Sequence, residues 1–348
     1  MNRLIPTGDT TVPTLKDIAA QAGVSITTVS NVLHNRTSRV SPEMVAKIWS
    51  IIEKEHYVPS MMARSLANDA SSIIGVITHM TSENTGSTMS DPFLGAFVEG
   101  IESRTREEGY YLMIRSVADA RALETLSLSW RLSGLILTGM FKDEFYECIK
   151  QLNTPFVLID SYVGQDDAYS IGLDDEKGGY MATKHLLENG HRVIAFASPT
   201  IREGGVVEKR LLGYKRALAE YGVAFDPELV FVQEISVEDG SRLGHKLAEK
   251  KKITGIFASA DILAAGIMKG LRERGVSVPD DKSIVGFDDN FLSQLTNPAL
   301  TTIHQDAARK GVLATDMILA QIRNQPIKER SVILPLSLVE RESVRNIN

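Results

Sequence analysis

The spacing of hydrophobic residues changes once along the chain, near residue 72. Before that point, apolar side chains recur at the three- and four-residue intervals of amphipathic helices, as at Leu15, Ile18, Ala19 and Ala22. From Ile73 onward, short continuous apolar runs alternate with amphipathic stretches. Such runs are typical of strands in parallel sheets that are covered on both faces by helices. The pattern therefore predicts a small helical domain followed by a larger α/β region.

The larger region contains six or more of these alternating units. Strands are expected at 73–78, 135–138, 156–160, 193–197, 255–259 and 283–287. Helices are expected near 93–108, 142–152, 177–189, 208–221, 239–250, 261–274 and 306–323. This many units suggests two doubly wound parallel α/β lobes. The predicted fold class is thus α/β, with an all-α head in front of the two lobes.

Residues 14–33 have the pattern of a helix-turn-helix. Thr14 can cap a first helix, and Gly23 supplies the positive φ that ends it. Ser25 can cap a second helix, whose apolar side includes Val29 and Val32. Two helices joined by about three residues around a Gly form the unit in which the second helix enters the DNA major groove. The alternative is an ordinary helical hairpin within a larger core.

A third helix favours the DNA-binding interpretation. It begins at Ser41, a capping residue, followed by Pro42, which suits the first helical position. Its apolar residues can close a three-helix core: Met44, Val45, Ile48, Ile51 and Ile52. The outward residues of the second helix are small or hydrogen-bonding, and none is acidic: Ser25, Ile26, Thr27, Ser30 and Asn31. We predict a DNA-binding head at 14–57, preceded by a flexible tail at 1–13.

The overall charge does not by itself indicate a nucleic-acid-binding protein. The chain has 38 basic and 44 acidic residues, a formal net charge of −6. Residues 1–69 hold seven basic and six acidic side chains, which gives +1. A basic footprint must therefore be local, at Arg36, Arg39 and Arg64 together with N–H groups at helix starts. One head should bind DNA weakly, so we expect a dimer that presents two.

The composition predicts a cytoplasmic protein. No apolar run approaches the roughly 18 residues of a membrane span, and residues 1–10 are too polar for a signal peptide. The single Cys148 excludes an internal disulfide, which fits a reducing compartment. We interpret Cys148 as a small apolar core residue of the helix at 142–152.

Three motifs follow one another at the N-terminal end: Thr14-Leu-x-Asp-Ile-Ala-x-x-Ala-Gly-Val-Ser-x-x-Thr-Val-Ser, then Tyr57-x-Pro59, then Ala63-Arg64-Ser65-Leu66-Ala67. With these motifs the chain resembles the lac repressor/gal repressor family of transcription regulators, and the resemblance extends to the C-terminus. It implies a homodimer that binds a pseudo-palindromic double-stranded DNA operator. It also implies a periplasmic-binding-protein-like effector domain and a small effector, a sugar or sugar derivative, bound between its lobes.

The resemblance nominates residues for DNA contact. In the head these are Thr14, Ser25, Ile26, Thr27, Thr28, Ser30, Asn31 and Arg36. Residues 58–71 would form a hinge, with Ala63 and Leu66 contacting DNA and Leu66 wedged between base steps of the minor groove.

The resemblance also supplies the assignment of the lobes within 72–348. It implies a first lobe of about 72–170 plus the returning helix at 306–323. It implies a second lobe of about 171–300 plus a last strand at 332–340. Three crossings between the lobes would then form a hinge around the effector cleft.

Carboxylates that end predicted strands are the candidate effector ligands. Asp160 ends one strand and Asp288-Asp289 ends another, and open α/β sheets bind ligands outside the carboxyl ends of their strands. A carboxylate there can accept two hydroxyl hydrogen bonds, as a sugar would require. Alternatively, each Asp caps the next helix. The resemblance nominates Phe93, Asp160, Asp174, Arg210 and Asp288 as effector ligands.

Two departures from the family pattern affect the identity of the effector. The chain has Ala260-Asp261 where the family usually has Asn-Asp, so one side-chain amide is missing. The loop at 80–91 is longer than usual and rich in Ser and Thr.

Two other classes of protein share some of these features. A periplasmic-type sugar-binding protein would have a similar two-lobed cleft but needs a signal peptide where this chain has a helix-turn-helix. An enzyme is disfavoured because the chain lacks a phosphate-binding loop, a dinucleotide fingerprint and a nucleophile elbow, and its seven His show no metal-ligand spacing. We predict no cofactor, metal site or catalytic residue. The predicted function is a DNA-binding transcriptional regulator, a repressor of carbohydrate-utilisation genes.

Overall fold

The computed structural model describes residues 13–33, 35–58, 71–79, 91–161, 163 and 168–348. The chain separates into two compact units, Met1–Ser71 and Ser72–Asn348. Most of the predicted hinge, with Ala63 and Leu66, lies outside the described residues, as do residues 1–12 of the predicted tail and the long loop at 80–90.

The first unit is a bundle of three helices, α1 (Leu15–Ala22), α2 (Ile26–Leu33) and α3 (Pro42–Lys54). The side chain of Thr14 accepts the N–H of Asp17, and the Asp17 carboxylate in turn accepts the N–H of Thr14. Gly23 then ends α1 at a φ of 74°, which a residue with a side chain seldom adopts. The buried core combines residues of all three helices with one tyrosine after them: Ile18, Ala19, Ala22, Val29, Val32, Ile48, Ile52 and Tyr57.

The second unit contains all the strands of the described chain. Its first part comprises β1 (Ile73–His79), α5 (Pro92–Glu107), β2 (Tyr111–Val117), α6 (Ala120–Trp130), β3 (Gly134–Thr138), α7 (Glu144–Gln151), β4 (Phe156–Ile159) and β5 (Tyr169–Leu173). Its middle part comprises α8 (Asp175–Glu188), β6 (Ile194–Ser198), α9 (Val206–Glu220), η2 (Pro227–Leu229), β7 (Val230–Val232), α10 (Val237–Glu249), β8 (Gly255–Ala258) and α11 (Asp261–Glu273). The last part comprises β9 (Ser283–Asp288), α12 (Phe291–Leu295), β10 (Thr301–His304), α13 (Ala307–Ile322), β11 (Ser331–Leu334) and β12 (Ser337–Val339).

These strands form two six-stranded sheets. The first sheet has the order β11-β5-β4-β3-β1-β2 and is parallel throughout. The second has the order β12-β10-β9-β8-β6-β7, and only β12 runs antiparallel to its neighbour. The predicted fold class, an α/β protein with two parallel-sheet lobes and a helical head, is therefore confirmed.

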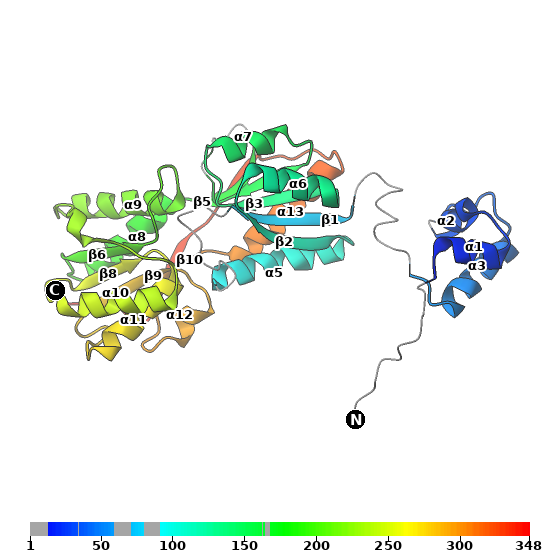
Figure 1. Ribbon diagram of the computed structural model, residues 1–348. Helices are drawn as coiled ribbons and strands as arrows, with labels where there is room; N and C mark the ends of the chain where they lie inside the picture. The colour runs from blue at the N-terminus through cyan, green and yellow to red at the C-terminus, as the bar shows by residue number, and fades with distance from the viewer. Residues whose placement is uncertain (1–12, 34, 59–70, 80–90, 162, 164–167) are drawn as a thin grey trace, which may run out of the picture. The chain divides into compact units, whose positions relative to one another are not determined.

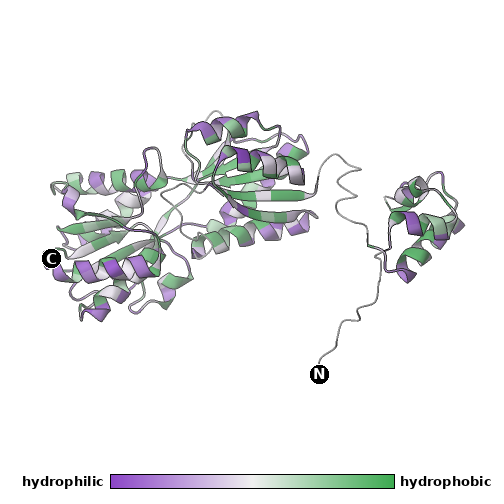
Figure 2. Ribbon diagram, viewed as in Figure 1, coloured by the Kyte–Doolittle hydropathy of each residue, from purple (hydrophilic) through white to green (hydrophobic). Residues whose placement is uncertain are grey.

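Helices cover both faces of each sheet (Figure 1). In the first lobe α6 and α7 lie on one face, and α5 and α13 pack together on the other. In the second lobe α8 and α9 cover one face, and α10 and α11 cover the other. Figure 2 shows hydrophobic strands inside each lobe and hydrophilic residues along the outer sides of the helices. Central strands such as β3 and β9 are buried on both faces, which explains their continuous apolar sequences.

The structure corrects the expected lobe boundaries at two places. β5 belongs to the first sheet, so the chain leaves that lobe after Leu173 rather than near residue 170. The segment 332–340, expected as one strand of the second lobe, divides between the lobes: β11 pairs with β5, and β12 pairs with β10. Pro335 lies between the two strands and has no N–H to donate, so it separates them.

The chain passes between the sheets three times. It crosses after β5, again between β10 and α13, and finally between β11 and β12. In the crossing before α13, Gln305 and Asp306 are the only residues between the two elements. No helix in the described part of the chain is long and apolar enough to span a membrane.

Candidate functional site

The second helix of the head presents several of the predicted DNA-contacting side chains at its surface. Ser25, Ile26 and Thr27 are exposed, with 47% of Ile26 accessible to solvent, and Asn31 is half-buried. The Oγ of Ser25 accepts the N–H of Thr28 at 3.1 Å, so this serine caps α2 as expected. The exposed apolar side chain of Ile26 at the start of a helix suits a contact with a base edge rather than with the head's own core.

Among the other predicted contacts of the head, Thr14 is hydrogen-bonded within the protein, whereas Arg36 is exposed. The hydroxyl of Thr14 donates to Asp17 at 2.6 Å, while Ser30 and Thr28 are half-buried. Arg36 is exposed beyond the end of α2. Lys47 donates to the carbonyl oxygen of Ala22 at 3.0 Å, so this lysine closes the end of α1.

A cavity of about 230 Å³ lies in the second unit at the carboxyl ends of strands from both sheets. From the first lobe it is lined by Asp91, Phe93, Thr138, Gly139, Met140, Phe141, Ile159 and Asp160. From the second lobe and the crossing it is lined by Gly205, Val206, Val207, Arg210, Ile235, Ser259, Ala260, Asp288 and Gln305. The structure therefore brings together four of the five predicted effector residues: Phe93, Asp160, Arg210 and Asp288.

Arg210 is fixed in place by protein groups. Its Nε donates to Asp175 at 2.8 Å, and its Nη1 donates to the carbonyl oxygen of Ser259 at 2.6 Å. The guanidinium lies over the ring of Phe287, 3.5 Å from the ring centroid. Because the guanidinium is bonded on one side and stacked on another, it is a preorganised wall of the cavity.

Asp288 ends β9 with a backbone φ of 115°, and Asp160 follows β4 with a φ of 50°. Positive φ angles are uncommon for residues other than glycine, and backbone outliers of this kind cluster at functional sites. The carboxylate of Asp288 accepts a hydrogen bond of 2.6 Å from Gln305 Nε2. Burial raises the pKa of Asp288 well above its usual value, against the opposing effect of Arg210. Neither carboxylate caps the next helix of the described chain: Asn290 caps α12 after Asp288, and Asp174 caps α8 after Asp160.

A buried lysine joins the two lobes beneath the cavity. Lys310 on α13 is fully buried, and its ammonium donates to both oxygens of Asp160 at 2.8 and 2.7 Å and to Gln305 Oε1 at 2.8 Å. Since Gln305 also donates to Asp288, a continuous chain of hydrogen bonds runs from the first lobe to the second. The same ammonium lies 5.2 Å from the ring centroid of Phe93.

Asp174 is not among the residues that line the cavity. Its side chain accepts the N–H of Lys177 at 2.9 Å and caps α8, so this predicted effector ligand is a capping residue in the structure. The next residue, Asp175, is buried and pairs with Arg210. Consecutive positions at a helix start point about 100° apart, so one of two adjacent carboxylates caps the helix while the other faces the core.

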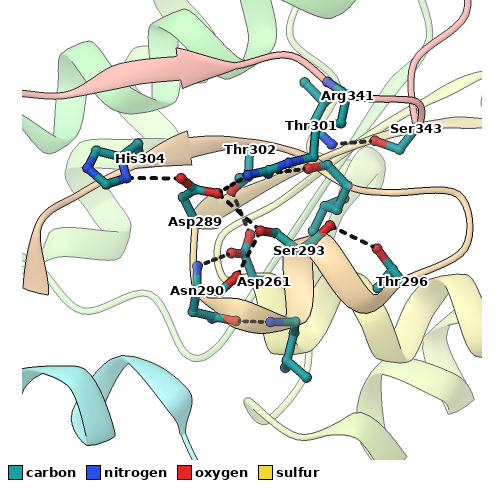
Figure 3. Close-up of polar contacts among 12 residues, drawn as sticks. Asp261, Asp289, Asn290, Ser293, Thr296, Thr301, Thr302, His304, Arg341 and Ser343 are labelled. Atoms are coloured by element: carbon teal, nitrogen blue, oxygen red, sulfur yellow. Dashed lines mark hydrogen bonds and ion pairs between the residues drawn. The ribbon is translucent and has the colours of Figure 1, made fainter.

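A second polar network joins residues of the second lobe that are next to cavity residues in the chain (Figure 3). Asp261 accepts hydrogen bonds from the Thr302 hydroxyl at 2.6 Å and from the Asn290 N–H at 3.0 Å. Asp289 accepts from Arg341 at 2.6 Å and from Ser293 at 3.1 Å, and one of its oxygens lies 3.0 Å from His304 Nδ1. Three members of this network are chain neighbours of cavity residues: Asp261 follows Ala260, Asp289 follows Asp288, and His304 precedes Gln305. The network therefore fixes the backbone of these cavity residues.

Sequence reasoning missed Asp175, Gln305, Lys310 and Ser259 as parts of the site. The dipeptide Asp174-Asp175 is visible in the sequence, but spacing alone does not separate its two roles. A lysine inside an apolar helix pattern, as in the sequence around Lys310, was the available signal for a buried ion pair. Ala260 lines the cavity, so the amide expected there from the family pattern is replaced by a methyl group.

Comparison with known proteins gives two matching family profiles. The profile described as bacterial regulatory proteins, lacI family, matches residues 14–60. The profile described as a periplasmic binding protein-like domain matches residues 183–344.

Individual relatives match over nearly the whole chain. The HTH-type transcriptional repressor PurR of Glaesserella parasuis serovar 5 (strain SH0165) is 31% identical over 96% of this chain and 99% of its own. A solved lac repressor dimer, bound to operator and the anti-inducer ONPF, superposes with a TM-score of 0.80 at 28% identity over 96% of this chain and 99% of its own. A LacI family regulator from Enterococcus faecium with bound ribose superposes with a TM-score of 0.68 at 26% identity over 79% of this chain and 100% of its own.

Proposed function

Because the chain belongs to the lacI family of bacterial regulatory proteins and is thus a DNA-binding transcriptional regulator rather than an enzyme, we propose that it represses carbohydrate-utilisation genes in the cytoplasm. In this proposal a small sugar or sugar derivative binds in the cavity of the second unit and controls the affinity of the head for an operator. The cavity lies where the two lobes meet, so its occupant can favour one arrangement of the lobes over another.

The observation that carries the proposal is the set of polar groups that line one cavity together with aromatic rings. The cavity of about 230 Å³ is lined by Asp160, Arg210 and Asp288, and the ring of Phe93 forms part of its wall. Carboxylates accept hydrogen bonds from hydroxyl groups, a guanidinium donates to a ring or hydroxyl oxygen, and an aromatic ring covers an apolar face. The volume is slightly below the roughly 300–1,000 Å³ of drug-sized sites, which suits a small polyhydroxy molecule. The bound ribose of the Enterococcus faecium regulator supports this class of ligand.

For the head, we propose that Ile26, Thr27 and Asn31 read bases and that Ser25 and Arg36 contact phosphate. Ile26 can touch a thymine methyl group, and an Asn side chain can bond adenine through two hydrogen bonds. The hinge residues Ala63 and Leu66 remain a proposal based on the family pattern alone. An operator with two half-sites requires a homodimer.

Exposed apolar side chains of the second unit support the homodimer. On α12, Phe291 is 60% exposed and Leu295 is 74% exposed. Large apolar groups that cluster at a surface commonly mark an interface between proteins. Light scattering of the full chain should give twice the molar mass of one chain.

Operator selection followed by ligand screening tests the proposed function. The full-length protein is used to select DNA from a random library, and the selected operator is then titrated in the presence of single sugars. We expect a pseudo-palindromic motif and a change in operator affinity with at least one sugar that also raises the melting temperature. Adenine is the matched alternative probe, because Phe93 and Phe141 both line the cavity and could stack on a planar base. A response to adenine and to no sugar contradicts the sugar proposal.

A further inference from the structure

Phe141 of the first lobe packs against a turn of the second lobe at the boundary of the cavity. The guanidinium of Arg202 lies over its ring, with 4.2 Å between Cζ and the ring centroid. The ring also lies close to Gly205, where an added Cβ would come within 3.1 Å of Phe141 Cε1. Both Phe141 and Gly205 line the cavity. The lobes therefore touch through these side chains as well as through the three crossings of the chain.

The turn at residues 202–205 is held in shape by its own hydrogen bonds. The N–H of Gly205 donates to the carbonyl oxygen of Arg202 at 3.0 Å, and the N–H of Gly204 donates to Glu208 Oε2 at 2.8 Å. Gly204 has a φ of 70°, which suits the third position of a turn. Glu208 lies in the first turn of α9, so the turn has a fixed position at the start of this helix. The first lobe thus meets a preformed surface.

The charge of Arg202 also acts within the first lobe. Burial is the largest cause that lowers the pKa of His79 at the end of β1, Asp143 opposes it, and Arg202 lowers the pKa further. The ring of His79 stacks on Phe145 of α7, with 4.1 Å between the centroids. Because charge effects weaken with distance, the guanidinium lies near these elements of the first lobe, although Arg202 belongs to the loop between β6 and α9.

This contact favours the arrangement in which the lobes are closed. Phe141 and Arg202 are both half-buried, and a cation over an aromatic ring is more favourable where water is partly excluded. Parting the lobes would return the ring and the guanidinium to water. Loss of such a contact should raise the ratio of open to closed molecules by about tenfold.

We propose that Phe141 and the turn at residues 202–205 form a latch that holds the lobes together before an effector binds. An effector must then enter while the latch is open, so the strength of the latch contributes to the concentration at which the protein responds. The inference goes beyond the proposed function and does not depend on the chemical class of the effector. The alternative is that the crossings, with the hydrogen bonds of Gln305, hold the lobes without help from Phe141.

Pulsed electron paramagnetic resonance on the full chain, with no effector added, tests the latch. Spin labels are attached at Glu147→Cys on α7 and Leu212→Cys on α9, in a chain that also carries Cys148→Ser. Both labelled positions are exposed, and their helices follow the two sides of the latch. An excess of unlabelled chains is added, so that each measured distance lies within one chain.

The labelled parent should give one dominant distance. Phe141→Ala should add a longer distance and raise the ratio of open to closed chains about tenfold. Arg202→Gln, which removes the charge but keeps much of the side chain, should shift the distances in the same direction. Phe225→Ala is the matched control, because Lys215 lies 4.4 Å from the centroid of its ring but both residues belong to the second lobe. Distances that stay unchanged in Phe141→Ala and Arg202→Gln, or that change equally in Phe225→Ala, would overturn the inference.

The double variant Phe141→Ala with Arg202→Gln shows whether the two residues act through one contact. If they do, the double variant should open no further than Phe141→Ala alone. Circular dichroism of each variant confirms that its lobes are folded, so that a change in distance reports the arrangement of the lobes. Shifts that add independently in the double variant would also overturn the latch, because each side chain would then act without the other.

Discussion

The ammonium of Lys310 lies 2.8 and 2.7 Å from the two carboxylate oxygens of Asp160, although 150 positions separate the residues in the chain. Asp160 follows β4 of the first sheet, and Lys310 lies on the helix that returns from the second lobe to the first. Through Gln305 the pair is also connected to Asp288 of the second lobe. Cavity-lining carboxylates of both lobes, Asp160 and Asp288, are thus connected through one buried lysine.

Replacing Lys310 by methionine should destabilise the second unit. Methionine fills a similar volume but leaves Asp160 without its partner, and removing one member of a buried ion pair costs about 3–5 kcal/mol. Because Asp160 borders the cavity, we expect a loss near the lower end, about 3 kcal/mol. Urea denaturation of the parent and the variant measures this difference in the free energy of unfolding.

The double variant Lys310→Met with Asp160→Asn separates a lost pair from a packing defect. If the pair is responsible, the second substitution should recover most of the lost stability, because no unpartnered charge remains. Strictly additive losses would show that the two side chains stabilise the protein independently.

Gly100 on α5 is a close-contact position against α13. A Cβ at Gly100 would overlap the carbonyl oxygen of Ala308, so the helices would have to separate. We expect Gly100→Ala to cost about 1–3 kcal/mol, as overpacking usually does. Gly95, on the same helix, faces open space for 4 Å around the point where a Cβ would lie, so it is the matched control. Gly95→Ala should be neutral or should stabilise by about 0.5 kcal/mol through helix propensity. Equal thermal shifts for the two variants would contradict this account of the packing.

Buried Asp261 should make stability depend on pH. Burial raises the pKa of Asp261 to about 7, although hydrogen bonds from Thr302 and Asn290 act in the opposite direction. The folded protein therefore holds a proton that the unfolded chain releases, and its stability falls between about pH 4 and pH 7. Asp261→Asn should remove this contribution, so its free energy of unfolding should gain on the parent across that range and level off above it. A difference that is independent of pH would show that Asp261 is ionised in the folded protein.

Much of this architecture could be predicted because buried parallel strands have a distinctive sequence. Strands such as β3 and β9 are continuous apolar runs, and the caps of α1 and α3 are readable at Thr14 and Ser41. The edge strand β2 was not predicted, because its apolar run of four residues, Tyr111–Ile114, is too short to distinguish a strand from a piece of helix. The division of 332–340 between two sheets depends on pairing partners far away in the chain, which periodicity does not contain.

The site was predictable in part for the same reason. Carboxylates that directly follow buried strands, such as Asp160 and Asp288, are visible in the sequence. The roles of Asp174 and Asp175 depend on the rotation of α8, and the partner of Lys310 depends on how α13 returns to the first lobe. These relationships exist only once the lobes are folded, so sequence spacing could not reveal them.

In the head, Asn31→Ala should reduce discrimination at one base pair in each half-site. An Asn side chain that bonds adenine in bidentate fashion contributes about 1–3 kcal/mol of discrimination, whereas non-specific binding depends on phosphate contacts. Selection from a random operator library, carried out in parallel with the parent and the variant, measures the change. Identical selected motifs would exclude Asn31 as a base-reading residue.

Titration of the selected operator with the parent and with Asp288→Ala, with and without the sugar that most raises the parent's melting temperature, tests the central claim most directly. Loss of the carboxylate leaves ligand hydroxyls unpaired, at about 1–3 kcal/mol for each group, so the sugar concentration needed for a response should rise at least about tenfold. The loss of response should exceed any loss of operator affinity, because the ligand and the operator are coupled only through the arrangement of the lobes. A variant that responds at the same sugar concentration as the parent would contradict the assignment of this cavity as the effector site.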